Sequence, residues 1–282
     1  MKQITVISGK GGTGKTVLTA SFAALARKAC FVDCDVDAAD LHLLLHPTVR
    51  EKHVFKSGST AVIERSRCRE CGECIDVCRF SAITDDYIVD SISCEGCAIC
   101  SIVCPSQAIT MEENLSGEWF VSTTKYGPFV HAKLGIAEEN SGKLVMKIRQ
   151  AAQSIAKDER LDYVIIDGPP GIGCPVIASL SGVDLALIVT EPTIAGIHDM
   201  ERILEVTDHF SIPAKVVVNK YDINMENTES ITEICHHKNV EVLAHLPFSE
   251  KIVQSMVEGI PMTEFSDNGV AKAISDLWQA LA

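Results

Sequence analysis

A glycine-rich loop near the N-terminus carries residues suited to phosphate chemistry. Residues 9–16 read G-K-G-G-T-G-K-T and match the phosphate-loop pattern G-x-x-x-x-G-K-[ST] without a mismatch. In such loops glycines let the backbone curl around oxygen atoms, the lysine reaches the β- and γ-phosphates, and the final hydroxyl holds Mg²⁺. The loop therefore predicts a magnesium ligand in Thr16 and nucleotide binding by Gly11, Gly12, Thr13, Gly14, Lys15, Thr16 and Val17.

The elements around this loop have the arrangement that phosphate binding requires. Residues 4–8 predict a short buried strand, and the Ala-rich residues 17–27 predict a helix. Strand, loop and helix in this order aim backbone N–H groups and a helix N-terminus at phosphate. A chance glycine-rich loop is the alternative, and the flanking elements argue against it.

Eight of the twelve cysteines fall into two runs with the same spacing. The runs are Cys68-x-x-Cys71-x-x-Cys74-x-x-x-Cys78 and Cys94-x-x-Cys97-x-x-Cys100-x-x-x-Cys104. This is the bacterial ferredoxin spacing, in which the fourth cysteine of each run ligates the other cluster. It predicts one [4Fe–4S] cluster on Cys68, Cys71, Cys74 and Cys104, and a second on Cys78, Cys94, Cys97 and Cys100. Zinc is the main alternative, but zinc sites use C-x-x-C pairs separated by longer gaps.

Composition narrows the class of protein. Hydrophobic residues make up 46% and charged residues 22% of the 282 residues, as in ordinary soluble globular proteins. The net charge of −13 argues against nucleic-acid binding, because the chain has no excess of basic residues to contact a phosphate backbone. No apolar run is long enough to span a membrane, and the N-terminus leads directly into the first strand without a signal peptide. We therefore expect a cytoplasmic protein that binds neither nucleic acid nor membrane.

Strand and helix patterns alternate on both sides of the cysteine-rich segment. This alternation predicts an α/β fold with a doubly wound parallel sheet and a nucleotide at the carboxyl ends of its strands. We expect a P-loop ATPase domain of residues 1–53 and 116–282, interrupted at 54–115 by a small α+β ferredoxin-like domain. The inserted domain has little core of its own, so its two clusters would hold it folded.

Lys10 makes the phosphate loop more specific. With this early lysine, K-G-G-T-G-K-T resembles the deviant Walker A loop of the MinD/ParA/Mrp ATPases, a superfamily that includes the nitrogenase iron protein. The resemblance covers nearly the whole chain. It implies hydrolysis of Mg-ATP with Lys10 and Lys15 as catalytic residues. It also implies a homodimer that forms on ATP binding, in which Lys10 reaches the nucleotide of the second subunit.

The resemblance also assigns roles to residues at the ends of predicted strands. It implies that Asp35 is the catalytic residue that orients the attacking water, and that Asp33 and Asp167 serve Mg²⁺. It implies adenine contacts for Asn219 and for Pro247, which lies in the stretch Leu246-Pro247-Phe248. The alternatives are that the acids only cap strand ends and that Asn219 only terminates its strand.

The four other cysteines divide into two kinds. Cys30, Cys34 and Cys235 are expected to pack as small apolar side chains. Cys174 lies seven residues after Asp167, the offset at which the nitrogenase iron protein has a cluster ligand. The resemblance therefore makes Cys174 a candidate for an extra metal site or for the dimer interface. A packed thiol is the alternative, because no cysteine between residues 105 and 173 supplies the second ligand of that protein.

These features predict a slow, partner-stimulated ATPase. It would couple nucleotide-driven dimerisation to electron delivery or to iron–sulfur or metallocofactor assembly, with a redox or metallocofactor partner protein. The loop at 138–143 is expected near the nucleotide or the dimer interface, a solvated connection being the alternative.

Three other functions are weighed against this one. The first is an Mrp-like carrier of an iron–sulfur cluster. A positioning switch like MinD or ParA is disfavoured, because the chain is acidic and its final helix, expected at 270–281, has no basic face. An amide-forming synthase is disfavoured because the chain has no glutaminase-like portion.

Overall fold

The chain forms two compact units. The structure is a computed structural model that describes residues 1–135, 141–267 and 269–282. The first unit comprises residues 1–53, 119–133 and 141 onward, and the second is built mainly from residues 54–118. The predicted insertion at 54–115 falls within the second unit. The loop expected near the nucleotide at 138–143 lies partly outside the described residues.

A single sheet organises the described chain. Its strands, in spatial order, are β3 (Thr48–Ile63), β4 (Ile109–Thr124), β5 (Gly127–Leu134), β2 (Ala29–Asp33), β6 (Tyr163–Pro170), β1 (Lys2–Ser8), β7 (Leu185–Thr190), β8 (Ala214–Asn219) and β9 (Glu241–Leu246). The strands from β5 to β9 pair in parallel, which confirms the predicted parallel-type α/β sheet.

Antiparallel strands extend the predicted parallel sheet at one edge. Only residues 125 and 126 separate β4 from β5. A two-residue connection joins antiparallel neighbours, because a parallel crossover needs a dozen or more residues. The sheet is therefore mixed: a hairpin has been added to the parallel strands at the edge where β3 and β4 continue into the second unit.

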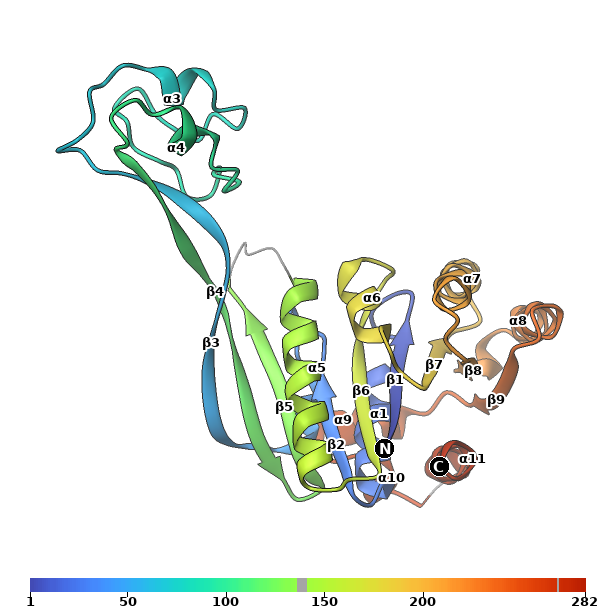
Figure 1. Cartoon of the computed structure of the whole chain (residues 1–282). Coiled ribbons are helices and arrows are strands. Elements are labelled where there is room, and N and C mark those ends of the chain that lie inside the picture. The colour runs from blue at the N-terminus through green and yellow to red at the C-terminus, as the bar shows by residue number, and fades with distance from the viewer. Residues whose placement is uncertain (136–140, 268) are drawn as a thin grey trace. The chain divides into compact units, whose positions relative to one another are not determined.

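Helices cover both faces of the sheet in the first unit (Figure 1). One face carries α5 (Ser141–Asp158), α6 (Cys174–Leu180), α7 (Ile194–His209) and α8 (Met225–His237). The other carries α1 (Lys15–Leu25), α2 (Leu41–Leu45), α9 (Glu250–Glu258), α10 (Met262–Phe265) and α11 (Gly269–Leu281). The doubly wound arrangement and the packing of the final helix are therefore confirmed. A short 3₁₀ helix, η1 (Tyr221–Ile223), links β8 to α8.

The strands of the first unit are buried on both sides. On one face Ile4 and Ile165, which are register partners, pack in the same core as Phe22 and Trp278, whose rings lie 5.3 Å apart. The next residue along β6, Ile166, points to the opposite face and is also fully buried. Two-sided burial explains why these strands read as continuous apolar runs.

The second unit is an internal repeat. Its short helices α3 (Glu73–Asp76) and α4 (Ile99–Val103) begin 26 positions apart (99 minus 73), as do the two cysteine runs. Left-handed backbone residues recur at the same offset, in the pairs Glu70 and Gly96, Gly72 and Ala98, and Ser81 and Gln107. Backbone N–H to sulfur bonds recur too, from Ala82 to Cys78 Sγ at 3.4 Å and from Ala108 to Cys104 Sγ at 3.3 Å.

Element ends differ from the predictions by a few residues. Helix α1 begins at Lys15 rather than Val17, so the phosphate-loop lysine is already helical. Cys34 lies one residue beyond β2 and is fully buried, as expected for a packed cysteine.

Candidate functional site

The phosphate loop occupies the turn between β1 and α1. The Ser8 hydroxyl donates a hydrogen bond to the Lys10 carbonyl at 2.6 Å, and the Gly171 N–H donates to the Ser8 carbonyl at 3.0 Å. Gly14, with φ 95°, precedes the helix in the left-handed region, and a Cβ there would lie only 2.6 Å from Asn219 Nδ2. The loop is therefore held from several sides, and glycine is required at its last turn.

A pocket opens over this loop and over α9. Its volume is about 300 Å³, the lower end of the range for small-molecule sites. One end is formed by Gly12, Gly14, Lys15, Thr16 and Val17. Asn219 and Lys220 adjoin the loop, and the rest of the wall is formed by Phe248, Ser249, Ile252, Val253 and Met256, with Asp40. The pocket thus has a polar end at the phosphate loop and a largely apolar end at α9, which suits a nucleotide.

Most of the predicted nucleotide-binding residues meet at this pocket. Thr13 is buried beneath the loop, and its hydroxyl has no hydrogen-bond partner among the described residues. Gly11 is exposed in the loop, and half-buried Pro247 precedes Phe248 without lining the pocket. The apolar residues of α9 were not predicted, although their placement directly after Leu246-Pro247-Phe248 was a usable signal.

The predicted acids converge because of strand register. Asp33 at the end of β2 pairs in register with Asp167 in β6, and both are buried. The Thr19 hydroxyl donates to Asp167 Oδ1 at 3.1 Å. Backbone N–H groups of Asp35 and Leu41 donate to the two oxygens of Asp33, each at 3.1 Å. Asp33 therefore ties the segment after β2 to the sheet, a role that the sequence did not reveal.

Burial sets the electrostatics of these carboxyl groups. Burial raises the pKa of Asp167 to about 6, against the opposing charge of Lys15 and hydrogen bonds from Thr16 and Thr19. Burial and the charge of Asp167 raise the pKa of Asp33 well above its usual value. Burial also raises the pKa of Asp35, against the opposing charge of Lys15. Adjacent buried carboxyl oxygens beside a threonine hydroxyl are a donor set that suits Mg²⁺.

Lys10 is held by its own chain. Its Nζ lies 3.7 Å from Glu191 Oε2, and the other oxygen of Glu191 pairs with Lys220 Nζ. The Lys10 side chain remains 37% exposed, whereas that of Glu191 is 13% exposed. Lys10 is therefore within reach of a second molecule at the surface.

Asn219 braces the phosphate loop. Its Nδ2 donates to the Thr13 carbonyl at 2.8 Å, and its Oδ1 accepts from the Lys220 N–H at 3.0 Å. The side chain is buried. This contact is additional to the adenine contact implied by the resemblance, and it positions the loop from the end of β8.

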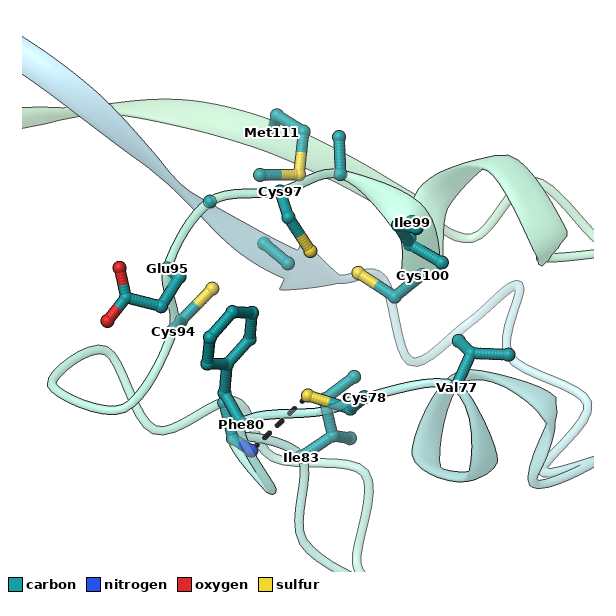
Figure 2. A pocket seen from close by; sticks show the side chains of 14 residues that line it. Val77, Cys78, Phe80, Ile83, Cys94, Glu95, Cys97, Ile99, Cys100 and Met111 are labelled. Carbon is teal, nitrogen blue, oxygen red and sulfur yellow. Dashed lines mark hydrogen bonds between the residues drawn. The ribbon is translucent and has the colours of Figure 1, made fainter.

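In the second unit, the structure brings the cysteines together as two sets of four. One cavity is lined by Cys68, Cys71, Cys74 and Cys104, and the other by Cys78, Cys94, Cys97 and Cys100. Each set takes three cysteines from one run and the fourth from the other, the pairing that the spacing predicts. Figure 2 shows the four sulfur atoms of the second cavity pointing toward the same space.

The chemistry of these cavities is that of thiols with amide donors. Burial raises the pKa of Cys74 and of Cys100. Burial also raises the pKa of Cys104, but hydrogen bonds from the Ser106 hydroxyl and the Ala108 amide outweigh it, and the net direction is down. Among the described residues no three His, Cys, Asp or Glu side chains converge closely enough to hold a metal ion. The cysteines instead surround a space between them.

The four cysteines outside the two cavities differ in burial. Cys30, Cys34 and Cys235 are fully buried, and burial raises the pKa of Cys30 to about 12 and of Cys235 to about 11. They are packed thiols. Cys174 is exposed as the first residue of α6, so the alternative of a packed thiol is wrong for it.

No helix in the described ranges is long and apolar enough to cross a membrane.

Comparison with known proteins agrees with this geometry. A family model described as the CobQ/CobB/MinD/ParA nucleotide binding domain matches residues 4–262. An uncharacterized protein of Methanocaldococcus jannaschii is 33% identical over 286 residues, which cover 99% of this chain and 96% of that protein. The septum site-determining protein MinD of Thermotoga maritima is 23% identical over 97% of this chain and 85% of its own length.

Two further similarities bear on fold and function. The solved structure of MinD from Pyrococcus horikoshii in complex with Mg-ADP superposes with a TM-score of 0.61 at 18% identity, covering 99% of this chain and 95% of that one. This likeness shows the fold. An iron-sulfur cluster carrier protein of Pyrococcus horikoshii is 27% identical over 154 residues, which cover 50% of this chain and 52% of that protein.

Proposed function

Because this chain belongs to the CobQ/CobB/MinD/ParA family of nucleotide-binding domains, we propose that it is a Mg-ATP-hydrolysing iron–sulfur protein. It is a P-loop protein of the MinD type, in a family whose members are ATPases. The specific proposal is that nucleotide-driven dimerisation controls electron delivery to, or metallocofactor assembly with, a partner protein.

The nucleotide part of the proposal rests on the pocket over the phosphate loop. Lys15 and the loop amides would hold the phosphates, with Thr16 and Asp167 serving Mg²⁺. Asp35, beside Lys15, would align the attacking water. Phosphoryl transfer by such a site depends mainly on positioning and charge neutralisation, so these few groups suffice. Adenine would lie at the apolar end, near Asn219 and Phe248.

Dimerisation is proposed from Lys10. The early lysine of the loop resembles that of deviant Walker A loops, and its side chain is partly exposed beside Glu191. On ATP binding Lys10 would leave Glu191 and reach the nucleotide of a second subunit, which makes the dimer dependent on ATP.

The observation that carries the iron–sulfur assignment is the grouping of eight cysteines around two cavities. Cys68, Cys71, Cys74 and Cys104 would hold one [4Fe–4S] cluster, and Cys78, Cys94, Cys97 and Cys100 the other. Backbone amides at Ala82 and Ala108 already donate to ligand sulfurs in both halves of the repeat, the kind of contact that tunes such clusters. Bound clusters of this type exchange single electrons.

The test is iron content together with nucleotide response. Two clusters predict about 8 Fe per chain after anaerobic reconstitution. ATP hydrolysis should require Mg²⁺, and electron paramagnetic resonance spectra of the reduced protein should change when Mg-ATP is added. An iron content well below two clusters per chain would contradict the iron–sulfur assignment. Spectra and reduction potentials that do not change with nucleotide would contradict the coupling between nucleotide binding and the clusters.

A carrier of iron–sulfur clusters is the second candidate. The exposure of Cys174 favours it, because a surface thiol on each subunit could meet its copy across a dimer. The partial similarity to an iron-sulfur cluster carrier protein points the same way. Iron in excess of two clusters per chain that is lost in Cys174→Ala would establish this candidate. Equal iron in both proteins would leave electron delivery as the function.

A further inference from the structure

The internal repeat makes the two cysteine cavities directly comparable. Positions 26 apart occupy equivalent places around the two cavities, as the recurring left-handed residues and sulfur contacts demonstrate. The backbone frame is therefore shared, whereas the side chains at three equivalent positions differ in kind. Phe80, Ile99 and Ile102 near the cavity of Cys78, Cys94, Cys97 and Cys100 correspond to Ser106, Glu73 and Asp76 near the other cavity.

The three apolar residues form what we call the apolar rim. Phe80 and Ile99 line the cavity and are 45% and 47% exposed (Figure 2). Ile102 follows Ile99 by three residues in α4, so the two side chains are surface neighbours. Ile102 is 80% exposed. Large apolar side chains that stay in water beside a functional cavity mark an interaction surface rather than a core.

The other cavity has charged side chains around it. Arg69 and Glu73 line it. Nearby, Arg67 pairs with Glu64 at 3.6 Å and Arg65 with Glu70 at 4.0 Å. Arg67 also donates to the carbonyl of Ser106 at 3.4 Å. Removing charged side chains from water carries a desolvation penalty, so this rim is less suited to docking an apolar face.

We propose that the apolar rim is the docking surface for a one-electron redox partner protein whose own face is apolar with basic side chains at its edge. The basic edge follows from Glu95, which lines the cavity, is exposed and has no cationic partner among the described residues. The proposal rests on the proposed function, because it places the exchange of electrons at the second of the two cavities. The charged rim then faces water.

The step is a one-electron transfer in which no covalent bond forms or breaks. The reduced protein loses one electron, and the partner gains it. Burying apolar side chains against a partner would bring the two redox groups close and exclude water between them. Opposite charge at the edge would raise the rate of encounter.

The experiment uses ferricytochrome c, a basic haem protein that accepts one electron, as the probe. The reconstituted full-length protein is reduced with dithionite, freed of excess reductant and mixed anaerobically with the probe in a stopped-flow instrument. The variant is Ile102→Asn, which replaces a rim residue by a neutral polar side chain at a position that lines neither cavity. The matched control is Asp76→Asn at the equivalent position. A second variant, Phe80→Ser, repeats the test at the cavity itself.

Two readouts decide the outcome. The second-order rate of probe reduction should fall at least tenfold in Ile102→Asn and change less than twofold in Asp76→Asn. The dissociation constant of the oxidised protein for the probe, measured by titration calorimetry at low salt, should weaken in the same variant only. Equal rates and affinities in variant and control would overturn the docking surface. Loss of rate without loss of affinity would overturn it as well.

The design separates this proposal from the one on which it depends. Iron per chain is measured on each protein before mixing. Absence of iron in the wild type would refute the proposed function, whereas full iron with no effect of Ile102→Asn refutes only the docking surface. Sedimentation without nucleotide tests whether a second copy of this chain occupies the rim. A wild-type dimer that Ile102→Asn converts to monomer would show that the rim binds a second copy of this chain instead.

Discussion

The two units of this chain secure their folds by different means. The first buries an extensive apolar core between a sheet and two layers of helices, with fully buried residues on nearly every strand and helix. The second has a small core cluster in which, among the described residues, Ala61, Cys74, Ile83 and Ile109 are buried, and one of these is a proposed cluster ligand. Its other neighbours are half-buried, and four of them are cysteines.

The difference indicates where the proposed clusters would contribute to stability. A unit of this size with so small a core lacks the apolar burial that stabilises small domains alone. Binding of the proposed clusters would then be part of the folding free energy. The first unit needs no such contribution, so nucleotide binding there can change its state without threatening its fold.

The largest expected effect comes from removing iron. Chelation, or replacement of Cys74 and Cys100 by serine, should increase amide hydrogen exchange in residues 54–118 by more than 100-fold, because cluster binding contributes several kcal/mol to folding. Exchange in residues 141–282 should stay unchanged. Hydrogen exchange mass spectrometry on the whole chain measures both regions at once.

Cys174→Ala serves as the control for cysteine loss, since it removes an exposed thiol outside both cavities. Equal protection of residues 54–118 with and without iron would contradict the contrast between the units, and would mean that the small core suffices.

The second effect comes from changing the nucleotide site rather than the cysteine cavities. Lys15→Ala should weaken Mg-ATP binding at least 100-fold, because the loop loses its charge on the β- and γ-phosphates. Iron per chain should be unaffected, since Lys15 lies at the nucleotide pocket. Fluorescent-nucleotide titration and iron analysis on the same preparation check this. If Lys15→Ala also lost its iron, the units would not be independent.

The fold was predictable because its signals are local and strong. A phosphate loop between a strand and a helix, followed by apolar strands that end in Asp33 and Asp167, determines the parallel α/β core. The pairing of Cys104 with the first cysteine run, and of Cys78 with the second, could likewise be predicted, because spacing alone determines which residues a repeat brings together.

What escaped prediction depends on contacts between distant residues. The antiparallel addition at β4 and β5 follows from a two-residue turn at Lys125 and Tyr126, neither of which is typical of tight turns. The bond from Asn219 to the Thr13 carbonyl joins residues 206 positions apart. The role of Asp33 in holding the Leu41 amide depends on how the chain returns after β2. No pattern within a short window records such contacts.

A third and smaller effect concerns this long-range contact. Asn219→Ala removes the donor to the Thr13 carbonyl and leaves a buried acceptor unpaired, which costs about 1.4 kcal/mol, or about tenfold in affinity for Mg-ATP. Asn227→Ala is the matched control, because Asn227 Nδ2 also donates to a backbone carbonyl, that of Pro192, at 3.0 Å. Calorimetric titration with Mg-ATP compares the two. Equal affinities would show that Asn219 does not brace the loop.

The smallest effect is the sensitivity of the first unit to acid. His131 stacks on Phe129 with ring centroids 4.8 Å apart and bonds Ser122 Oγ at 3.2 Å. Burial, with a smaller contribution from His42, lowers its pKa to about 4. Between pH 6.5 and 4 the unfolded chain therefore binds a proton that the folded chain does not bind. The free energy of unfolding has its full value above this window and falls as the pH falls through it. Allowing for partial exposure, this free energy falls by about 1 kcal/mol from pH 7 to pH 5.

His131→Phe keeps the ring but cannot titrate. Unfolding of the first unit, followed by the fluorescence of Trp119 and Trp278, should therefore depend less on pH in this variant than in the wild type. An identical pH dependence in both proteins would assign the acid sensitivity of the first unit to other groups.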